Sequence, residues 1–297
     1  MLAAFGGRMM RVFGNFWGTA VIAAIVATSF GGPLGAVEIA PDLKRKINVA
    51  GTQRMLSQRM AKAACFRSLG VGGADHVEVL ANARTRFARA LAGLRDGDTS
   101  LGTQPEDNPA VLAALDDVTA RWQTYEAALD HAHEDRDALV LVAADSLPVL
   151  KASNDVVLAL EASNVQDGVS QELARLINVS GRQRMLTQKA AKEFCLIAAG
   201  IDAEAQRMSL AQTVALFDRS LAGLLAGDDD MGLIGAPDDL IFLQLEHVGD
   251  LWGPLRSQFM RVVDGANPGP TALFTVSANI DTVLKAADEA VWLYENF

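Results

Sequence analysis

The strongest constraint on the fold is an internal duplication with a spacing of 130 residues. Residues 47–66 read INVAGTQRMLSQRMAKAACF, and residues 177–196 read INVSGRQRMLTQKAAKEFCL. The same spacing relates Trp122 to Trp252, and a spacing of 134 relates residues 149–152 to residues 283–286. A fold that fits this chain must therefore contain one structural unit twice.

Each copy has the pattern of four helices. Apolar residues recur every three or four positions, and glycine-containing or acidic segments separate the periodic stretches. In the first copy we expect helices over residues 41–69, 75–95, 109–131 and 136–164. The sequence shows no strand signal, so it predicts an all-α fold of two tandem up-down four-helix bundles, residues 37–165 and 166–297, that form a pseudo-dimer.

The relative arrangement of the two units depends on the join at residues 163–168. If the chain reverses there, the units lie side by side with their first helices parallel. If a helix continues through the join, the units stack end to end and the two motifs lie far apart. The turn-forming pair Asp167-Gly168 favours reversal.

Residues 1–36 have the pattern of a secretory signal peptide. Two arginines precede an uncharged apolar run that ends at Phe30, and small residues follow as far as Ala36, where cleavage would remove the leader. The alternative is an uncleaved inner-membrane anchor, since residues 12–30 are close to the length that spans a bilayer. Either arrangement places the rest of the chain in the periplasm.

The charge of the chain is unevenly distributed. The formal net charge is −10, yet residues 42–67 and 172–195 are both net positive. A basic island in an acidic protein argues against nucleic acid as a partner, because nucleic acid requires a broad basic surface. The distribution favours a small anion that is bound locally.

The repeated motif places one arginine in the middle of a helix stripe of small and apolar residues. The stripe of the first copy is Ile47, Ala50, Gly51, Arg54, Gln58, Ala61 and Cys65, and that of the second is Ile177, Ser180, Gly181, Arg184, Gln188, Ala191 and Cys195. Glycine is unfavourable inside a helix, so its presence one turn before each arginine indicates close contact with a backbone or a ligand.

Each buried arginine needs a partner, because an unpaired ion inside a protein is very unstable. One alternative is a carboxylate on a neighbouring helix. The other is an external oxyanion that bridges Arg54 and Arg184, since planar guanidinium groups suit planar oxyanions. The amides of Asn48, Asn178, Gln58 and Gln188 would then either orient the arginines and the ligand or bond nearby carbonyl groups.

The two cysteines, Cys65 and Cys195, occupy equivalent positions of the repeat. In an exported protein with its two copies facing each other, they could form a disulfide. Two small buried apolar side chains are the alternative.

The motif also resembles a known family of sensor domains. Residues 47–62 are similar to the N-terminal domain of the type IV pilus methyl-accepting chemotaxis transducer, and residues 47–55 resemble the start of the periplasmic domain of nitrate/nitrite sensor histidine kinases. In those nitrate sensors the glycine and arginine of the motif contact nitrate between two subunits. The matching residues here are Gly51, Arg54, Gly181 and Arg184. Thr52 corresponds to Arg182, so a bridged site would be asymmetric.

Catalysis has no support in the sequence, which shows no nucleophile with a suitably spaced base, no phosphate-binding loop, no metal-ligand pattern and no cofactor motif. We therefore expect a non-catalytic periplasmic sensory protein that binds nitrate, nitrite or a similar oxyanion. The second copy runs to Phe297 and leaves no residues for a separate signalling domain. We therefore expect a membrane receptor or sensor kinase to bind the liganded and unliganded forms differently. The alternative is a helical scaffold for an envelope, pilus or chemotaxis partner, with no small ligand.

Overall fold

The computed structural model describes residues 41–163 and 168–297, and these form eight α-helices and one short 3-10 helix. The first module contains α1 (Pro41–Ser68), α2 (Ala74–Asp96), α3 (Pro109–His131) and α4 (Arg136–Ser163). The second contains α5 (Gly168–Ala198), α6 (Ala203–Ala226), the 3-10 helix η1 (Asp229–Met231), α7 (Asp239–Val263) and α8 (Pro270–Asn296). The expected signal peptide or anchor, including residues 12–30, lies outside the described residues.

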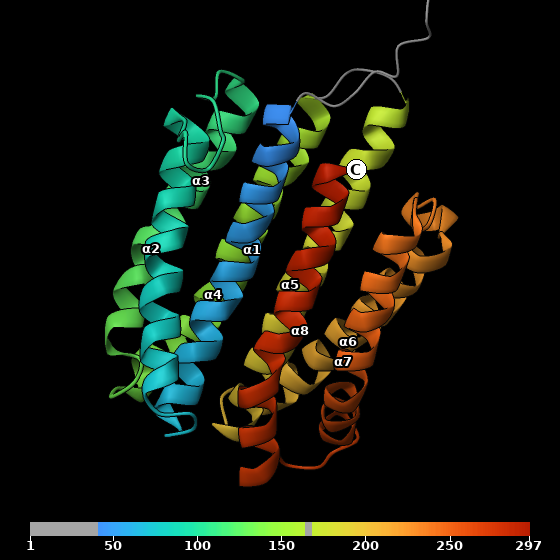
Figure 1. The fold of residues 1–297 in the computed structure, drawn as a ribbon. Coiled ribbons are helices and arrows are strands. Elements are labelled where there is room, and N and C mark those ends of the chain that lie inside the picture. The colour runs from blue at the N-terminus through green and yellow to red at the C-terminus, as the bar shows by residue number, and fades with distance from the viewer. Residues whose placement is uncertain (1–40, 164–167) are drawn as a thin grey trace, which may run out of the picture. The chain divides into compact units, whose positions relative to one another are not determined.

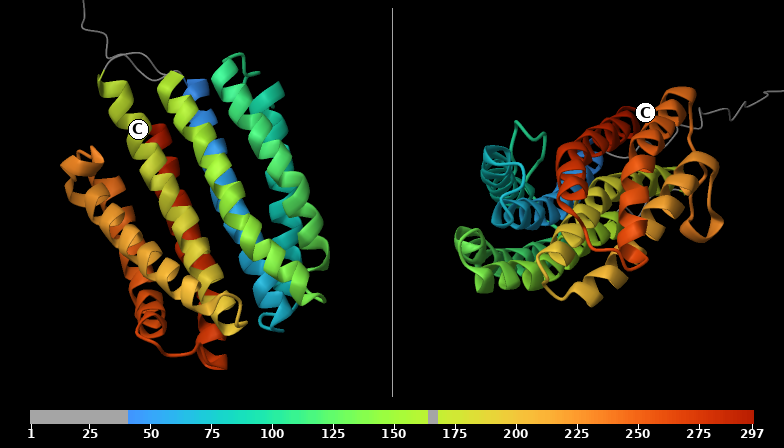
Figure 2. Two further views of the ribbon diagram at one scale, coloured as in Figure 1. Left: turned by 180° about the vertical axis from the view of Figure 1, so that it is seen from behind. Right: turned by 90° about the horizontal axis from the view of Figure 1, so that it is seen from below.

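The prediction of an all-α fold with two four-helix modules is confirmed. Helices α1, α4, α5 and α8 lie in the middle, with α2 and α3 on one flank and α6 and α7 on the other (Figures 1 and 2). Within the described part of the chain, no helix is both long enough and apolar enough to span a bilayer.

The two modules lie side by side, which was one of the two arrangements compatible with the sequence. Helix α4 ends at Ser163, α5 begins at Gly168, and α5 runs parallel to α1 (Figure 1). Bonds between α1 and α5 join the two copies of the motif, since a disulfide links the equivalent residues Cys65 and Cys195, and Arg54 hydrogen-bonds Asn178, the counterpart of Asn48. The two repeated motifs therefore face each other between these helices, from the asparagines to the disulfide.

Each module has its own aromatic core, built from equivalent residues. Phe87 stacks on Trp122 with ring centroids 4.5 Å apart, and Phe217 stacks on Trp252 at 4.0 Å. All four side chains are buried, so the tryptophans anchor the packing of α3 and α7.

A repeated glycine lets the loop after the second helix of each module pack closely. A Cβ atom on Gly93 would lie 2.8 Å from Leu101 Cδ1, and one on Gly223 would lie 2.9 Å from Leu233 Cδ1. Such contacts are too short for carbon atoms, so any side chain at these positions would displace the loop leucine from the end of the helix. The Leu-Ala-Gly-Leu repeat therefore reflects packing.

Helices α1 and α5 are unusual because they are rich in polar residues and yet enclosed. Helix α1 packs against α2, α4 and α5, and α5 packs against α1, α6 and α8. We call the contact between α1 and α5 the α1–α5 interface; it contains the two stripes of the repeated motif. Charged and amide side chains in this interface must satisfy one another, because water has little access to them.

Replacing both cysteines, as in the variant Cys65→Ser/Cys195→Ser, is expected to lower the free energy of unfolding by about 2–5 kcal/mol. The crosslink joins residues 130 positions apart and therefore restricts the unfolded chain strongly. Urea denaturation followed by circular dichroism measures the change. Reduced wild-type protein should match the double variant, and equal midpoints for oxidised and reduced protein would contradict the expectation.

Candidate functional site

The structure brings the two arginines of the repeated motif together at the α1–α5 interface. Arg54 on α1 and Arg184 on α5 are only 1% and 2% exposed. A Cβ atom on Gly51 would lie 3.3 Å from Nη2 of Arg54 and 3.4 Å from Nη2 of Arg184, and one on Gly181 would lie 3.5 Å and 3.2 Å from the same atoms. Both guanidinium groups therefore lie against both glycines.

Arg54 is held entirely by neutral acceptors. Its Nη1 donates to Oδ1 of Asn154 at 2.9 Å and to Oδ1 of Asn178 at 2.7 Å, and its Nη2 donates to the backbone oxygen of Asn178 at 3.2 Å. No carboxylate in residues 41–163 or 168–297 forms an ion pair with it. Three of its five N–H groups are thus used and its charge is not neutralised by direct contact.

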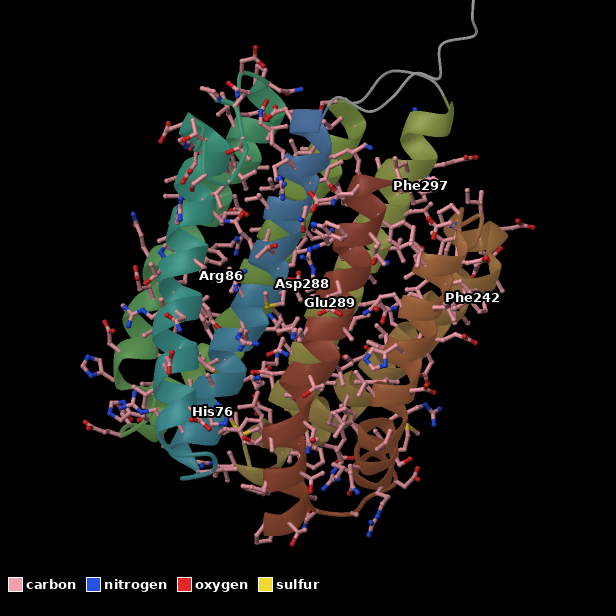
Figure 3. All side chains as sticks on the ribbon, viewed as in Figure 1. His76, Arg86, Phe242, Asp288, Glu289 and Phe297 are labelled. Atoms are coloured by element: carbon pink, nitrogen blue, oxygen red, sulfur yellow. A yellow bond between two sulfur atoms is a disulfide. The ribbon has the colours of Figure 1, made fainter. Side chains whose placement is uncertain are left out.

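Arg184 has one neutral and one charged partner. Its Nη2 donates to Oδ1 of Asn48 at 2.8 Å, and its Nη1 donates to Oδ1 of Asp288 at 2.7 Å. The side chain of Asp288 is 60% exposed and lies on α8, next to α1 in Figure 3. A carboxylate partner, which was one alternative for the arginines, is therefore present for Arg184 alone in the described part of the chain.

Two asparagines connect the modules reciprocally. Asn48 of the first module contacts Arg184 of the second, and Asn178 of the second contacts Arg54 of the first. Each asparagine also donates through Nδ2 to a glutamate across the interface, Asn48 to Glu295 at 2.7 Å and Asn178 to Glu161 at 3.0 Å. These bonds fix the orientation of each amide, so that its oxygen faces a guanidinium group.

The electrostatic environment of Arg54 is unfavourable for a cation. Burial, together with the positive charges of Arg182 and Arg184, lowers the pKa of Arg54 to about 9, and the negative charge of Glu161 opposes this effect. The Nε atoms of Arg54 and Arg184 have no hydrogen-bond partner among the described residues. The pair therefore retains unused donors and uncompensated positive charge, the two properties that attract an anion.

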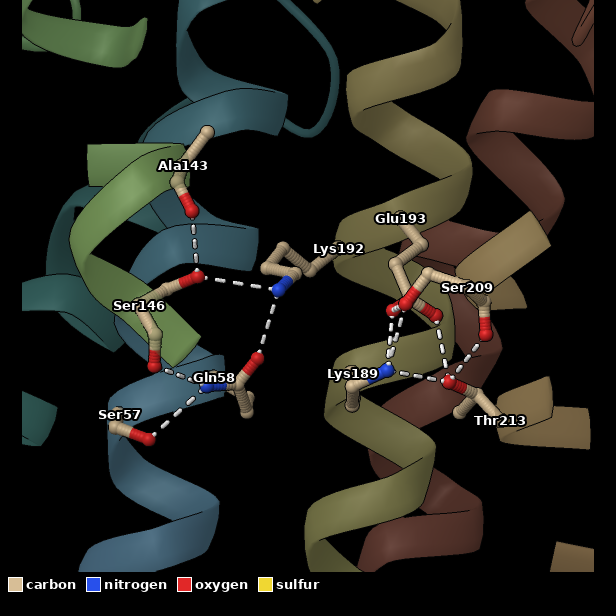
Figure 4. Close-up of polar contacts among 9 residues, drawn as sticks. All are labelled: Ser57, Gln58, Ala143, Ser146, Lys189, Lys192, Glu193, Ser209 and Thr213. Carbon is tan, nitrogen blue, oxygen red and sulfur yellow. Dashed lines mark hydrogen bonds and ion pairs between the residues drawn. The ribbon is translucent and has the colours of Figure 1, made fainter. Parts of the chain in front are cut away.

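The glutamines of the motif, Gln58 and Gln188, form no hydrogen bond with the two arginines in the described part of the chain. Gln58 donates to the backbone oxygen of Ser146 at 2.8 Å and accepts from Lys192 at 2.9 Å (Figure 4). Gln188 donates to Asp281 at 3.2 Å. Both amides therefore serve a second polar layer, one helical turn below the arginines.

This second layer contains two buried lysines at equivalent positions of the repeat. Lys62 forms an ion pair with Asp281 at 2.6 Å, whereas Lys192 bonds only the neutral Gln58 and Ser146. Burial is the main cause that lowers the pKa of each lysine to about 8. Among the described residues, Arg54 and Lys192 thus both carry positive charge without a directly bonded acid.

The residues that the sequence analysis missed are Asn154, Asp288, Glu161 and Glu295. They were detectable, because the spacing of 134 pairs Asn154 with Asp288 and Glu161 with Glu295. The imidazoles and acids of residues 131–135 take no part in the site. Within the described residues, no group of three or more His, Cys, Asp or Glu side chains is placed to hold a metal.

The stability of the protein relative to the variant Lys192→Met should increase with pH above 8. Between the folded pKa of about 8 and the ordinary value of 10.5, the unfolded chain binds more protons at Lys192, so raising the pH favours folding. We expect a relative gain of about 2 kcal/mol by about pH 9.5. Urea denaturation of both proteins from about pH 7 to 9.5 measures it, and parallel profiles would refute it.

The chain matches one protein family in two segments. The family is described as PilJ, type IV pili methyl-accepting chemotaxis transducer N-term, and it matches residues 42–147 and 169–273. The two segments correspond to the two modules and cover more than half of the chain.

Two curated proteins are also similar to the chain. Methyl-accepting chemotaxis protein McpN of Pseudomonas aeruginosa is 37% identical over 93 residues, which are 31% of this chain and 17% of that protein. The putative methyl-accepting chemotaxis AlkN of Alcanivorax borkumensis is 25% identical over 253 residues, which are 83% of this chain and 34% of that protein. The aligned regions thus span about a third or less of these relatives. The chain belongs to the family of type IV pili methyl-accepting chemotaxis transducer N-terminal domains and carries the sensory domain twice.

Proposed function

We propose that this tandem sensory domain binds a small oxyanion, nitrate or nitrite first, between Arg54 and Arg184 at the α1–α5 interface. The proposed role is binding and signalling without catalysis. The observation that carries it is the meeting of two buried guanidinium groups, one of which bonds no carboxylate in the described part of the chain.

The repulsion between these two cations supports the proposal. Like charges that approach each other inside a protein interact more strongly than in water, because the surroundings screen them less. An anion between the groups would replace that repulsion by two attractions. A bound anion is therefore expected to strengthen the contact between α1 and α5.

The donors that remain free suit a planar oxyanion. Arg54 uses three of its five N–H groups and Arg184 uses two, and Nε is among the free donors of both. A guanidinium group presents such donors in one plane and can bond two oxygens of one anion. Gly51 and Gly181 add no side-chain bulk beside them.

The second candidate function is a helical interaction scaffold with no small ligand. The ion pair between Arg184 and Asp288 favours it, because this arginine already has an internal counterion. The absence of a similar acid at Arg54, within the described residues, weighs against this candidate.

A periplasmic location fits the proposed role, since sensor domains of chemotaxis transducers typically lie there. The disulfide between Cys65 and Cys195 agrees with an oxidising compartment. A membrane receptor or sensor kinase would read the bound state through its different affinity for the liganded and unliganded forms.

Isothermal titration calorimetry of the purified protein with nitrate, nitrite and sulfate tests the proposal. We expect binding of at least one of the first two anions, and a loss of about tenfold or more in affinity for Arg54→Ala and Arg184→Ala, because each removes a charged donor. Arg54→Lys keeps the charge but loses the planar fork, so it should also bind more weakly.

Arg121→Ala is the matched control, since Arg121 is an exposed arginine on α3 whose loss changes the net charge equally. Circular dichroism would verify that each variant is folded. No binding by the wild type, or equal binding by the site variants and the control, would leave the scaffold function as the better account.

A further inference from the structure

The two halves of the arginine site differ in charge at the residues that bond the arginines from α4 and α8. Asn154 on α4 accepts from Arg54 at 2.9 Å, and Asp288 on α8 accepts from Arg184 at 2.7 Å. The spacing of 134 makes these two residues counterparts. The duplication has thus placed an amide and a carboxylate at the same position of two otherwise similar half-sites.

The two glutamates near the site, Glu161 and Glu295, are equivalent residues of the two halves, and each interacts with an arginine outside the pair as well as with one of the pair. Arg45 lies 3.6 Å from Glu295. Burial raises the pKa of Glu161, and the charges of Arg54, Arg175 and Arg182 oppose that effect. These glutamates therefore do not create a difference between the halves, whereas Asp288 does so where it bonds Arg184.

Asp281, a further acid of α8, has its partners outside the arginine pair. It bonds Arg59 at 2.9 Å and Lys62 at 2.6 Å, in the layer of the buried lysines. Its charge is therefore balanced locally. Among the groups in direct contact, the arginine pair has two guanidinium groups and one carboxylate, Asp288, which leave one net positive charge. Four further charged groups act on the pair or on Asp288 from a longer distance. They are two acids and two cations, so they do not change this net charge: Glu161, Glu295, Arg86 and Arg182.

Building on the proposed function, we propose that Asp288 determines the charge of the ligand and makes the site select a singly charged oxyanion over a doubly charged one. A monovalent anion neutralises the remaining charge completely. A divalent anion would leave an excess negative charge close to the carboxylate of Asp288, and repulsion in this enclosed interface would weaken its binding.

The geometry lets Asp288 exert this effect without blocking the ligand. It bonds only Nη1 of Arg184, so Nε of that arginine stays available. Its side chain is 60% exposed and reaches the site from α8, whereas Arg86 of α2 lies on the other side of α1 in the view of Figure 3. Asp288 therefore acts as a fixed negative charge at the edge of the site.

The test compares nitrate with sulfate by calorimetry at constant ionic strength on the wild type and Asp288→Asn. We expect the wild type to bind nitrate more tightly, and the ratio of sulfate to nitrate affinity to rise about tenfold or more in the variant. Because the variant recreates the amide of the first half-site, it is expected to fold. Glu289→Gln is the control, because it also removes one negative charge from α8. Glu289 is the residue after Asp288, and it accepts a hydrogen bond from Gln244 of α7 instead of bonding an arginine of the site.

The reciprocal variant Asn154→Asp gives a second measurement. It places a second carboxylate against Arg54 and cancels the remaining charge, so nitrate affinity should fall about tenfold or more. Nitrate binding that is unchanged in this variant would count against the charge argument.

The outcomes separate this inference from the proposed function. If the wild type binds nitrate but Asp288→Asn leaves the sulfate-to-nitrate ratio unchanged, or Glu289→Gln shifts it equally, the role of Asp288 is wrong and the site stands. If neither the wild type nor any variant binds either anion, both proposals fall together.

Discussion

The close approach of two buried guanidinium groups to the same pair of glycines is the constraint on which the rest of the α1–α5 interface depends. Arg54 and Arg184 both lie against Gly51 and Gly181, where their charges are poorly screened. Neighbouring groups partly compensate these positive charges: amide oxygens, a backbone carbonyl and the carboxylate of Asp288. An external anion would complete the compensation, and this physical requirement connects the fold to a sensory role.

The bonds of the α1–α5 interface are reciprocal, so both modules are needed to form it. Each arginine bonds an asparagine of the other module, so neither module could complete the arrangement alone. The disulfide between Cys65 and Cys195 joins the same two helices covalently. Since both copies belong to one chain, they can also diverge, as Asn154 and Asp288 have done. A homodimer of identical subunits cannot do this, because symmetry repeats every residue.

The sequence predicted the helices well and the contacts of the site incompletely. Apolar periodicity placed the helices of the first module within one or two residues of their observed ends, because a helix face that packs on a core needs that period. The importance of Arg54 and Arg184 followed from their position in the repeat. Their partners on α4 and α8 did not, because those bonds join residues about a hundred positions apart.

The sequence by itself determined that one helical unit occurs twice, that the arginines lie in the middle of an apolar stripe, and that glycine precedes each by one turn. These are local or repeated properties, and a linear pattern records them. Only the tertiary structure decided that the modules lie side by side, that the two stripes face each other, and that Asp288 neutralises one arginine while Asn154 leaves the other charged. Those features depend on which helices pack together, and packing is set by the whole chain at once.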